Sequence, residues 1–365
     1  MKTASQISAF VPAENAVTEY HILLSVKDPS LSFGRQLEEV LLGYRDAVEG
    51  KTVHFRRFFL SDAANQAPLL AEALEKLPAV PTSVVQQAPL DGTRIALWIY
   101  CTSPMDCPAG VPSHNGYSHY WEGSLVSPGK DSREQMGGIF ANLEGKLAGK
   151  GLSVASDTVR TWIFVRDVDV NYGGVVVGRR EYFNGIGLTP STHFIASTGI
   201  EGRSSDFRDL VEMDAYSIKG LREGQKRYLQ APDHLSPTAL YGVTFERGTA
   251  VTYGDRRHIF ISGTASIDSK GQVLYPGDVS AQTGRLLENV AALLSEADAG
   301  LENIVMAIVY LRDPADYPLV KKVIGETCPS LPALFVLGPV CRPAWLVEME
   351  CMAIIPAGNP SFPAY

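Results

Sequence analysis

The sequence has few cysteines and no long apolar run. Its 365 residues include five cysteines, at 101, 107, 328, 341 and 351, and no Cys-x-x-Cys pair. This pattern supports neither a disulfide framework nor a structural zinc site. The apolar runs are too short to span a bilayer, and no apolar signal-peptide core follows Met1. We therefore expect a cytoplasmic protein with reduced thiols and no membrane segment.

Positive charge is also scarce. Lys and Arg total 32 against 40 Asp and Glu, a net charge of -8. Because nucleic-acid binding depends on Lys and Arg that neutralise phosphates, we expect no nucleic-acid partner. His114 and His119 have no third ligand near them, so no metal is expected. A small anionic ligand remains compatible with this composition if arginines gather locally.

The sequence does contain an internal repeat. Leu-Val-Glu-Met occurs at 210–213 and again at 346–349, which places Glu212 where the later copy has Glu348. The flanks repeat as well, because Gly34–Val40 matches Gly284–Val290 and Asn142 matches Asn289. A Leu/Val-x-Asp string recurs at 60–62, 165–167 and 311–313. These matches predict three diverged copies of about a hundred residues.

The three copies predict three domains, at 1–102, 103–235 and 236–365, with an insertion at about 172–203 in the second. Apolar periodicity within a copy gives the order strand, helix, strand, helix, strand, strand. The first 18 residues are expected to form an irregular lead-in, and 225–237 a linker. We therefore predict an α+β fold in which mixed sheets pack with helices.

The stretch Trp345–Cys351 alternates carboxylates with apolar residues. This predicts a strand with Glu348 and Glu350 on an acidic face and Val347 on a buried one. In the first copy Leu97 falls at the position of Glu348, so that copy lacks the acid. A glutamate in a closed cleft has a raised pKa because it is desolvated, and it can then act as a general acid near neutral pH.

Three strings in the last copy, His258–Ala265, Leu311–Tyr317 and Leu346–Glu350, resemble the Rid (YjgF) family. Members of that family form trimers with a site in each cleft between neighbours. The resemblance implies that three Rid/YjgF-like (chorismate-mutase-like) repeats build a pseudo-trimer within one chain, either a monomer or a weak oligomer. Simple Rid deaminases bind the substrate carboxylate through an arginine at the position where this chain has Leu334.

A second resemblance covers more of the chain. The strings Val177–Phe183, Ala196–Gly202, Ser262–Ser266 and Cys341–Glu348 resemble motifs of the chorismatases. That resemblance implies cofactor-independent cleavage of chorismate to pyruvate and either a hydroxybenzoate or a dihydroxycyclohexadiene carboxylate. It makes Glu348 the proton donor. Gly263 and Cys341 are the residues of the branch that forms 3-hydroxybenzoate, which is the favoured product.

The expected site residues follow from these motifs. Glu348 and Cys341 are the catalytic candidates, with the cysteine as a pocket-shaping group or weak donor. Arginine holds a carboxylate in a two-pronged pair, so substrate binding is expected from the arginines and from the remaining motif residues: Arg342, Arg179, Arg180, Tyr182, Gly263 and Thr198.

Other interpretations remain open at this stage. Arg179-Arg180 could be a solvated helix turn, and Cys341 a small buried apolar residue. A Rid-type enamine or imine deaminase is one alternative function. A non-catalytic small-ligand-binding protein is another, and the absence of the family arginine at Leu334 favours it.

Overall fold

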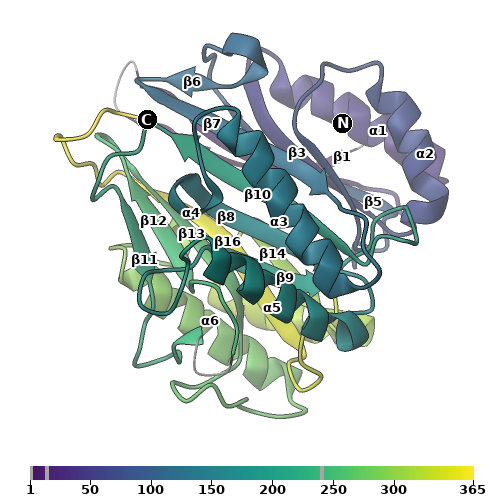
Figure 1. The fold of residues 1–365 in the computed structure, drawn as a ribbon. Coiled ribbons are helices and arrows are strands. Elements are labelled where there is room, and N and C mark those ends of the chain that lie inside the picture. The colour runs from purple at the N-terminus through teal and green to yellow at the C-terminus, as the bar shows by residue number, and fades with distance from the viewer. Residues whose placement is uncertain (1–2, 13–15, 239–241) are drawn as a thin grey trace.

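The protein consists of three mixed β-sheets with helices packed on their outer sides (Figure 1). This computed structural model describes residues 3–12, 16–238 and 242–365. In every sheet the last strand of the repeat lies between two others, and a parallel pair of strands forms one edge. The common order confirms the predicted α+β fold with three repeats.

The first sheet has the order β1-β2-β5-β3-β4, and its repeat comprises β1 (Thr3–Phe10), β2 (Glu19–Val26), α1 (Phe33–Val48), β3 (Thr52–Leu60), α2 (Ala63–Leu74), β4 (Thr82–Gln86) and β5 (Ile95–Thr102). The second, β6-β7-β10-β8-β9, comprises β6 (Ser113–His114), β7 (Tyr117–Leu125), α3 (Ser132–Ala148), α4 (Val154–Asp157), β8 (Thr158–Val165), α5 (Val168–Gly185), β9 (Ala196–Glu201) and β10 (Val211–Lys219).

The third sheet has six strands in the order β11-β12-β13-β16-β14-β15. Its repeat comprises β11 (Lys226–Leu229), β12 (Gly248–Thr252), β13 (Arg257–Ala265), α6 (Val279–Ser295), β14 (Ile304–Leu311), α7 (Tyr317–Thr327), β15 (Ala333–Leu337) and β16 (Val347–Ile355). β11 precedes the predicted boundary at 235 but pairs with β12, so the third unit begins earlier than expected.

Two segments predicted to be irregular contain edge strands. β1 lies within the predicted lead-in and pairs with β2, and β11 lies in the predicted linker. Residues 1, 2 and 13–15 of the lead-in lie outside the described residues. An edge strand exposed over much of its length, as β1 is, lacks the apolar alternation that marks a buried face, so the sequence pattern did not reveal it.

The segment 172–203, predicted to be an insertion, is mostly a regular part of the second repeat. Helix α5 connects β8 to β9, as α2 connects β3 to β4 and α7 connects β14 to β15. The connection has 30 residues (166–195), against 21 in each other repeat (61–81 and 312–332). The longer connection allows an α5 of 18 residues, compared with 12 in α2 and 11 in α7. This longer helix reaches the candidate site.

A glutamine on the first long helix of each repeat holds the segment that enters the central strand. Its side-chain oxygen accepts a backbone N–H in three equivalent places: Gln36 from Arg94 at 2.8 Å, Gln135 from Leu210 at 2.8 Å and Gln282 from Leu346 at 2.9 Å. This equivalence shows that the predicted match of Gly34–Val40 with Gly284–Val290 was wrong by four residues. A slip of one helical turn preserves the apolar face, which is why the pattern tolerated it. The match of Asn142 with Asn289 has the same offset as the glutamines and is confirmed.

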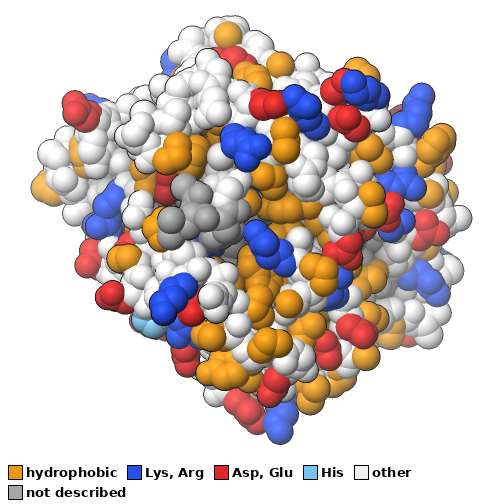
Figure 2. Space-filling model, turned by 60° about the horizontal axis from the view of Figure 1, so that its bottom comes forward, with side chains coloured by type: hydrophobic (Ala, Val, Ile, Leu, Met, Phe, Trp, Pro, Cys, Tyr) orange, Lys and Arg blue, Asp and Glu red, His pale blue; other side chains and the backbone are white. Residues whose placement is uncertain are grey.

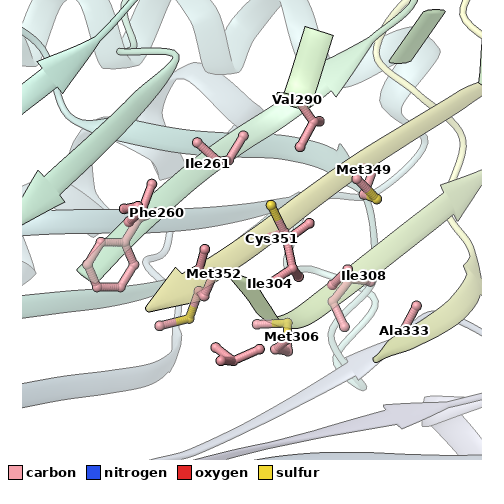
Figure 3. Close-up of a cluster of buried hydrophobic side chains, with 14 of the residues drawn as sticks. Phe260, Ile261, Val290, Ile304, Met306, Ile308, Ala333, Met349, Cys351 and Met352 are labelled. Carbon is pink, nitrogen blue, oxygen red and sulfur yellow. The ribbon is translucent and has the colours of Figure 1, made fainter. Parts of the chain in front are cut away.

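The third repeat shows how helix and sheet share one core. Figure 3 shows buried side chains that converge from β13, β14, β15, β16 and α6, among them Ile261, Ile308, Val290 and Cys351. Burial of one such aliphatic side chain contributes about 1.5–3 kcal/mol relative to leaving it exposed. The cluster therefore fixes β16, the strand that carries Glu348.

The three repeats close into a ring through equivalent backbone hydrogen bonds. The end of each parallel edge strand meets the segment after the corresponding strand of the next repeat: Gln86 N donates to Arg203 O at 2.8 Å, Glu201 N to Pro339 O at 3.1 Å and Leu337 N to Ala88 O at 2.8 Å. Repeat one thus contacts two, two contacts three, and three contacts one. A head-to-tail contact that closes after three steps is the arrangement of a cyclic trimer.

Buried charges join the repeats at the centre of this ring. Arg57 of β3 pairs with Asp214 of β10 at 2.7 Å and lies 3.7 Å from Glu350 of β16. Arg160 of β8 pairs with the other oxygen of Glu350 at 2.8 Å. All four side chains are at most 2% exposed. One ion network therefore spans the three sheets.

Within the described residues no helix is long and apolar enough to cross a membrane. On the face in Figure 2, Lys and Arg side chains alternate with Asp and Glu, and hydrophobic side chains gather in a hollow between them. That face carries no broad patch of a single sign.

Candidate active site

A narrow, largely enclosed cavity lies between the second and third repeats. Its described lining comes from α5, β9, β13, β16 and three loop segments: Tyr172, Arg179, Ser197, Gly199, Val243, Phe245, Arg247, Gly263, Ala265, Ile267, Cys341, Arg342, Trp345 and Glu348. The space open to water-sized molecules is about 30 Å³, which is room for about two waters. A ligand the size of a six-membered ring therefore requires some of these side chains to move outward.

Glu348 forms the acidic floor of the cavity. It stands opposite Ala265 of β13 and Tyr310 of β14, and its residue is 4% exposed. All nine residues of β16 are buried, so the prediction of a strand with a single buried face was wrong. The acidic face is turned into the closed ring of sheets and not toward solvent.

The surroundings of Glu348 favour its neutral form. Burial, together with the charge of Glu350, raises the pKa of Glu348 to about 8 against the opposing charges of Arg247 and Arg160. The group is therefore a carboxylic acid near neutral pH. A protonated acid in a closed polar cavity has the property that a general acid needs.

Gly263 makes room for this acid. A Cβ at position 263 would overlap Glu348 Oε1 and would come within 3.1 Å of Thr198 Cγ2. The backbone N–H of Gly263 donates to Thr198 Oγ1 at 3.0 Å. The absence of a side chain thus lets Glu348 approach β13.

Cys341 lines the cavity from the segment that follows β15 and lies next to the Tyr172 hydroxyl. Burial, with the nearby charge of Glu348, raises the pKa of Cys341 to about 12, although Tyr172, Arg342 and Arg179 oppose the shift. The side chain is therefore a thiol at neutral pH. This agrees with the interpretation of Cys341 as a shaping group and not a nucleophile.

Three guanidinium groups line the cavity. Arg179 of α5 is 2% exposed, and its Nε donates to Thr244 Oγ1 at 3.1 Å. Arg247 precedes β12, and its Nη2 donates to Ser236 O at 2.9 Å. Arg342 adds the third group from the segment beside Cys341. Together these cations can hold a ligand that carries carboxylates.

The structure separates the predicted binding residues into two sets. Arg179, Arg342 and Gly263 line the cavity, but Arg180 and Tyr182 do not. Arg180 is exposed, and Tyr182 stacks on Phe140 at 5.5 Å between ring centroids. Successive residues of a helix point about 100° apart, so only some of that motif can face the cavity.

Thr198 stands behind the cavity and not in its described lining. Its hydroxyl donates to Glu350 and receives a hydrogen bond from Arg160. Thr198 thus connects Gly263 with the central ion network. Its predicted role as a binding residue changes to support of the acid-bearing strand.

Several lining residues were missed from the sequence. Tyr172 lies seven residues before Arg179, a spacing that puts two helical residues on one face, so periodicity could have found it. Arg247, Phe245 and Trp345 gave no such signal. They reach the cavity through sheet pairing and loop packing.

The counterpart of Glu348 in the first repeat also needs correction. Glu348 pairs with the penultimate residue of β14, and Ala96 holds the same place against β3. Leu97, the predicted counterpart, packs toward the helices. A slip of one residue reverses the face of a strand. The first repeat lacks the acid in either alignment.

Comparisons with known proteins agree with this arrangement. A family model described as Endoribonuclease L-PSP matches residues 248–355. The 3-aminoacrylate deaminase RutC of Acinetobacter baylyi is 33% identical over 97 residues, which are 26% of this chain and 77% of that protein. The chain belongs to the RutC family. A RutC family protein of Pyrococcus abyssi is 36% identical over 97 residues, 26% of this chain and 76% of its own.

The RutC family chain also matches a complete crystal structure of a chorismatase. The alignment covers 95% of this chain and 100% of that one, with a TM-score of 0.65 and 18% sequence identity. The three-repeat arrangement is therefore a fold already seen in one chain. The resemblance to the Rid family is confirmed at the level of family, and the resemblance to the chorismatases at the level of fold.

Proposed function

We propose that this protein is an enzyme that cleaves chorismate and releases pyruvate, with Glu348 as the general acid. The observation that supports this most directly is a neutral carboxylic acid enclosed with three arginines in one cavity. Chorismate is a dianion with an enol ether. The arginines match its two carboxylates, and the acid matches the carbon that must be protonated.

The chemistry needs no cofactor. Glu348 donates a proton to the methylene carbon of the enolpyruvyl group, and the resulting cation is stabilised by the ether oxygen. Cleavage of the ether bond to the ring releases pyruvate. If the neighbouring ring hydroxyl oxygen then bonds to the freed ring carbon and breaks its own C–O bond, and that carbon loses its proton, the product is 3-hydroxybenzoate. Direct loss of the proton on the hydroxyl-bearing carbon gives 4-hydroxybenzoate, and neither route takes up water. Addition of one water instead gives pyruvate and a dihydroxycyclohexadiene carboxylate.

We favour 3-hydroxybenzoate as the product. Gly263 and Cys341 both touch the site, and they are the residue types that the resemblance ties to that branch. The buried thiol and the absent side chain shape the cavity beside the acid. Product analysis by chromatography distinguishes the hydroxybenzoates from the diol.

Enamine or imine deamination is a second candidate, because one relative in the family is named as a 3-aminoacrylate deaminase. Leu334 lies on β15 opposite Ile308 and is 8% exposed. An apolar side chain there cannot bind the carboxylate as the arginine of simple Rid deaminases does. Ammonia release from an enamine, without pyruvate release from chorismate, would favour this candidate.

The deciding experiment follows pyruvate release from chorismate in three proteins. Glu348→Gln keeps the size of the side chain but removes the acid, so we expect turnover to fall by about 10²–10⁴-fold with little change in KM. Glu212→Gln alters the matching acid of the second repeat and should leave turnover intact. Loss of activity in Glu212→Gln but not in Glu348→Gln would place the active site in the other cleft.

A further inference from the structure

The cleft between the first and second repeats is built like the candidate active site. Glu212 stands opposite Phe164 of β8 at the place where Glu348 stands opposite Tyr310 of β14. Ser124 precedes the residue paired with Met213, as Gly263 precedes the residue paired with Met349. The two clefts therefore correspond position by position, and both retain the acid.

This second cleft holds a larger cavity, with about 490 Å³ open to water-sized molecules. Helix α2 provides an apolar wall that includes Leu70 and Ala71. Val84 of β4 and Val126, which directly follows β7, extend this wall. Val84 lies opposite Phe58 in the parallel pair, where Gly199 of the active-site cleft lies opposite Ile163. The volume is within the range of small-molecule sites.

Glu212 lines this cavity, and its carboxylate oxygens lack well-formed hydrogen bonds within the part of the chain that the structure describes. The residue is 2% exposed, and neither carboxylate oxygen has a hydrogen-bond partner of ordinary geometry among the described residues. Burial, together with the charge of Asp214, raises the pKa of Glu212 to about 8, and the nearby Ser124 hydroxyl opposes the shift. Near neutral pH the side chain is a hydrogen-bond donor without an acceptor. Leaving a buried polar group unpaired is unfavourable, so a ligand that accepts this hydrogen bond gains affinity from it.

The charge of this cavity differs from that of the active site. The described residues that line it include no Lys or Arg, whereas Glu212 and Asp209 are acidic. Arg179 reaches the other cleft from α5, whereas the described lining residues of the equivalent helix α2 are all apolar, among them Leu70 and Leu74. A dianion that suits the first cleft has nothing to neutralise it in the second.

We propose that this cleft is a second ligand site, specific for an uncharged and mainly apolar small molecule that accepts a hydrogen bond from Glu212. A ketone or ester carbonyl on an aromatic or aliphatic body has this chemistry. The inference stands apart from the proposed reaction, since it concerns a different cleft and a different ligand class.

Methyl benzoate is a suitable probe because it is uncharged and does not titrate. Its binding can be followed by ligand-observed NMR at pH 7, with benzoate as the charged comparison. We expect saturable binding of the ester, and at least tenfold weaker binding of the anion. Ala71→Trp should fill the cavity and weaken ester binding at least tenfold. Ala64→Trp makes the same change at an exposed position of the same helix outside the lining, and it should leave binding intact.

The pH dependence tests the role of Glu212. Ester binding to the wild type should weaken as pH rises through about 8, because the carboxylate no longer donates. Glu212→Gln retains a donor that does not titrate, so its binding should be independent of pH. Ester binding that is equal in Ala71→Trp and Ala64→Trp, or absent from the wild type, would overturn the proposal. Pyruvate release should be unchanged in Ala71→Trp, which separates this test from that of the proposed reaction.

Discussion

Glu348 and Glu350 lie on the same face of β16, but their surroundings differ because Glu350 is paired with an arginine whereas Glu348 lines the candidate active site. Glu350 accepts hydrogen bonds from Arg160 at 2.8 Å and from Tyr310 at 3.0 Å. Glu348, two residues earlier on the same face, faces the cavity and is raised in pKa by burial and by the charge of Glu350. The charge of Glu350 thus helps to keep the proposed acid protonated, whereas Arg160 of the same network opposes this effect.

The protonation of Glu348 predicts the pH profile of the reaction. A general acid acts in its protonated form, so kcat/KM for chorismate should be level below pH 8 and fall about tenfold per pH unit above it. Initial rates of pyruvate release between pH 6 and pH 10 give this profile. A rate that rises through pH 8 would show that the essential group acts as a base.

Gly263 gives a second prediction at this scale. In Gly263→Ala the new methyl group meets Glu348 Oε1, so the acid must move away from its place. We expect turnover to fall by about 10²-fold, the usual effect of displacing a catalytic group by about 1 Å. Gly284→Ala is the control, because a Cβ there meets nothing within 4 Å. Full activity in Gly263→Ala would mean that the position of Glu348 is not critical.

Among the helices and strands, α5 connects the packing against α3 with the candidate active site. Its glycines let it approach α3, since a Cβ at Gly178 would overlap Arg133 O and one at Gly174 would overlap Ser132 Oγ. The close approach sets where Tyr172 and Arg179 reach the cavity. A change in helix packing should therefore alter ligand binding.

Gly178→Ala tests this coupling. Overpacking at a tight contact costs about 1–3 kcal/mol, so we expect a lower free energy of unfolding in urea and a raised KM for chorismate. Gly173→Ala is matched to it, because that position on the same helix is open and alanine is the better helix former by about 1 kcal/mol. Equal stability of the two variants would contradict the close-packing argument.

At the scale of the whole molecule, three repeats in one chain form the ring that three subunits form in simple Rid proteins. The monomeric or weakly associated state expected from this arrangement stays a prediction for light scattering. Because the repeats share one chain, their clefts can differ in sequence. The cleft between the second and third repeats combines Glu348 with arginines, and the cleft between the first and second places Glu212 beside an apolar wall. In the first repeat Ala96 takes the position of the acid.

The central ion network gives the prediction for the whole molecule. Arg57→Met leaves Asp214 buried without its cation, so we expect a loss of about 3–5 kcal/mol in the free energy of unfolding. Arg57→Met/Asp214→Leu removes both charges and should recover most of that loss. Arg35→Met, which breaks an exposed pair with Glu38, should leave the free energy of unfolding nearly unchanged, because solvent screens an exposed ion pair. If Arg57→Met had the same free energy of unfolding as the wild type, the ion network would not be what holds the repeats together.

The sequence alone determined the repeat, the order of most elements and the acid at Glu348. These features depend on local periodicity and on strings that survive divergence, such as the Leu/Val-x-Asp string, whose first residue ends β3, β8 and β14. The sequence alignment of the repeats was wrong in two places. The helix that begins near Gly34 was misaligned by about one turn, and the strand that contains Leu97 by one residue. Each shift leaves the apolar pattern nearly intact.

The tertiary structure decided which side chains meet. Arg247 and Trp345 join Glu348 because a sheet, a loop and the contact between repeats bring them together, and no spacing in the sequence records those contacts. The closed ring also decided that the acidic face of β16 is buried, which raises the pKa of Glu348. Local sequence specifies a strand and its two faces, but only packing determines which of them is removed from water.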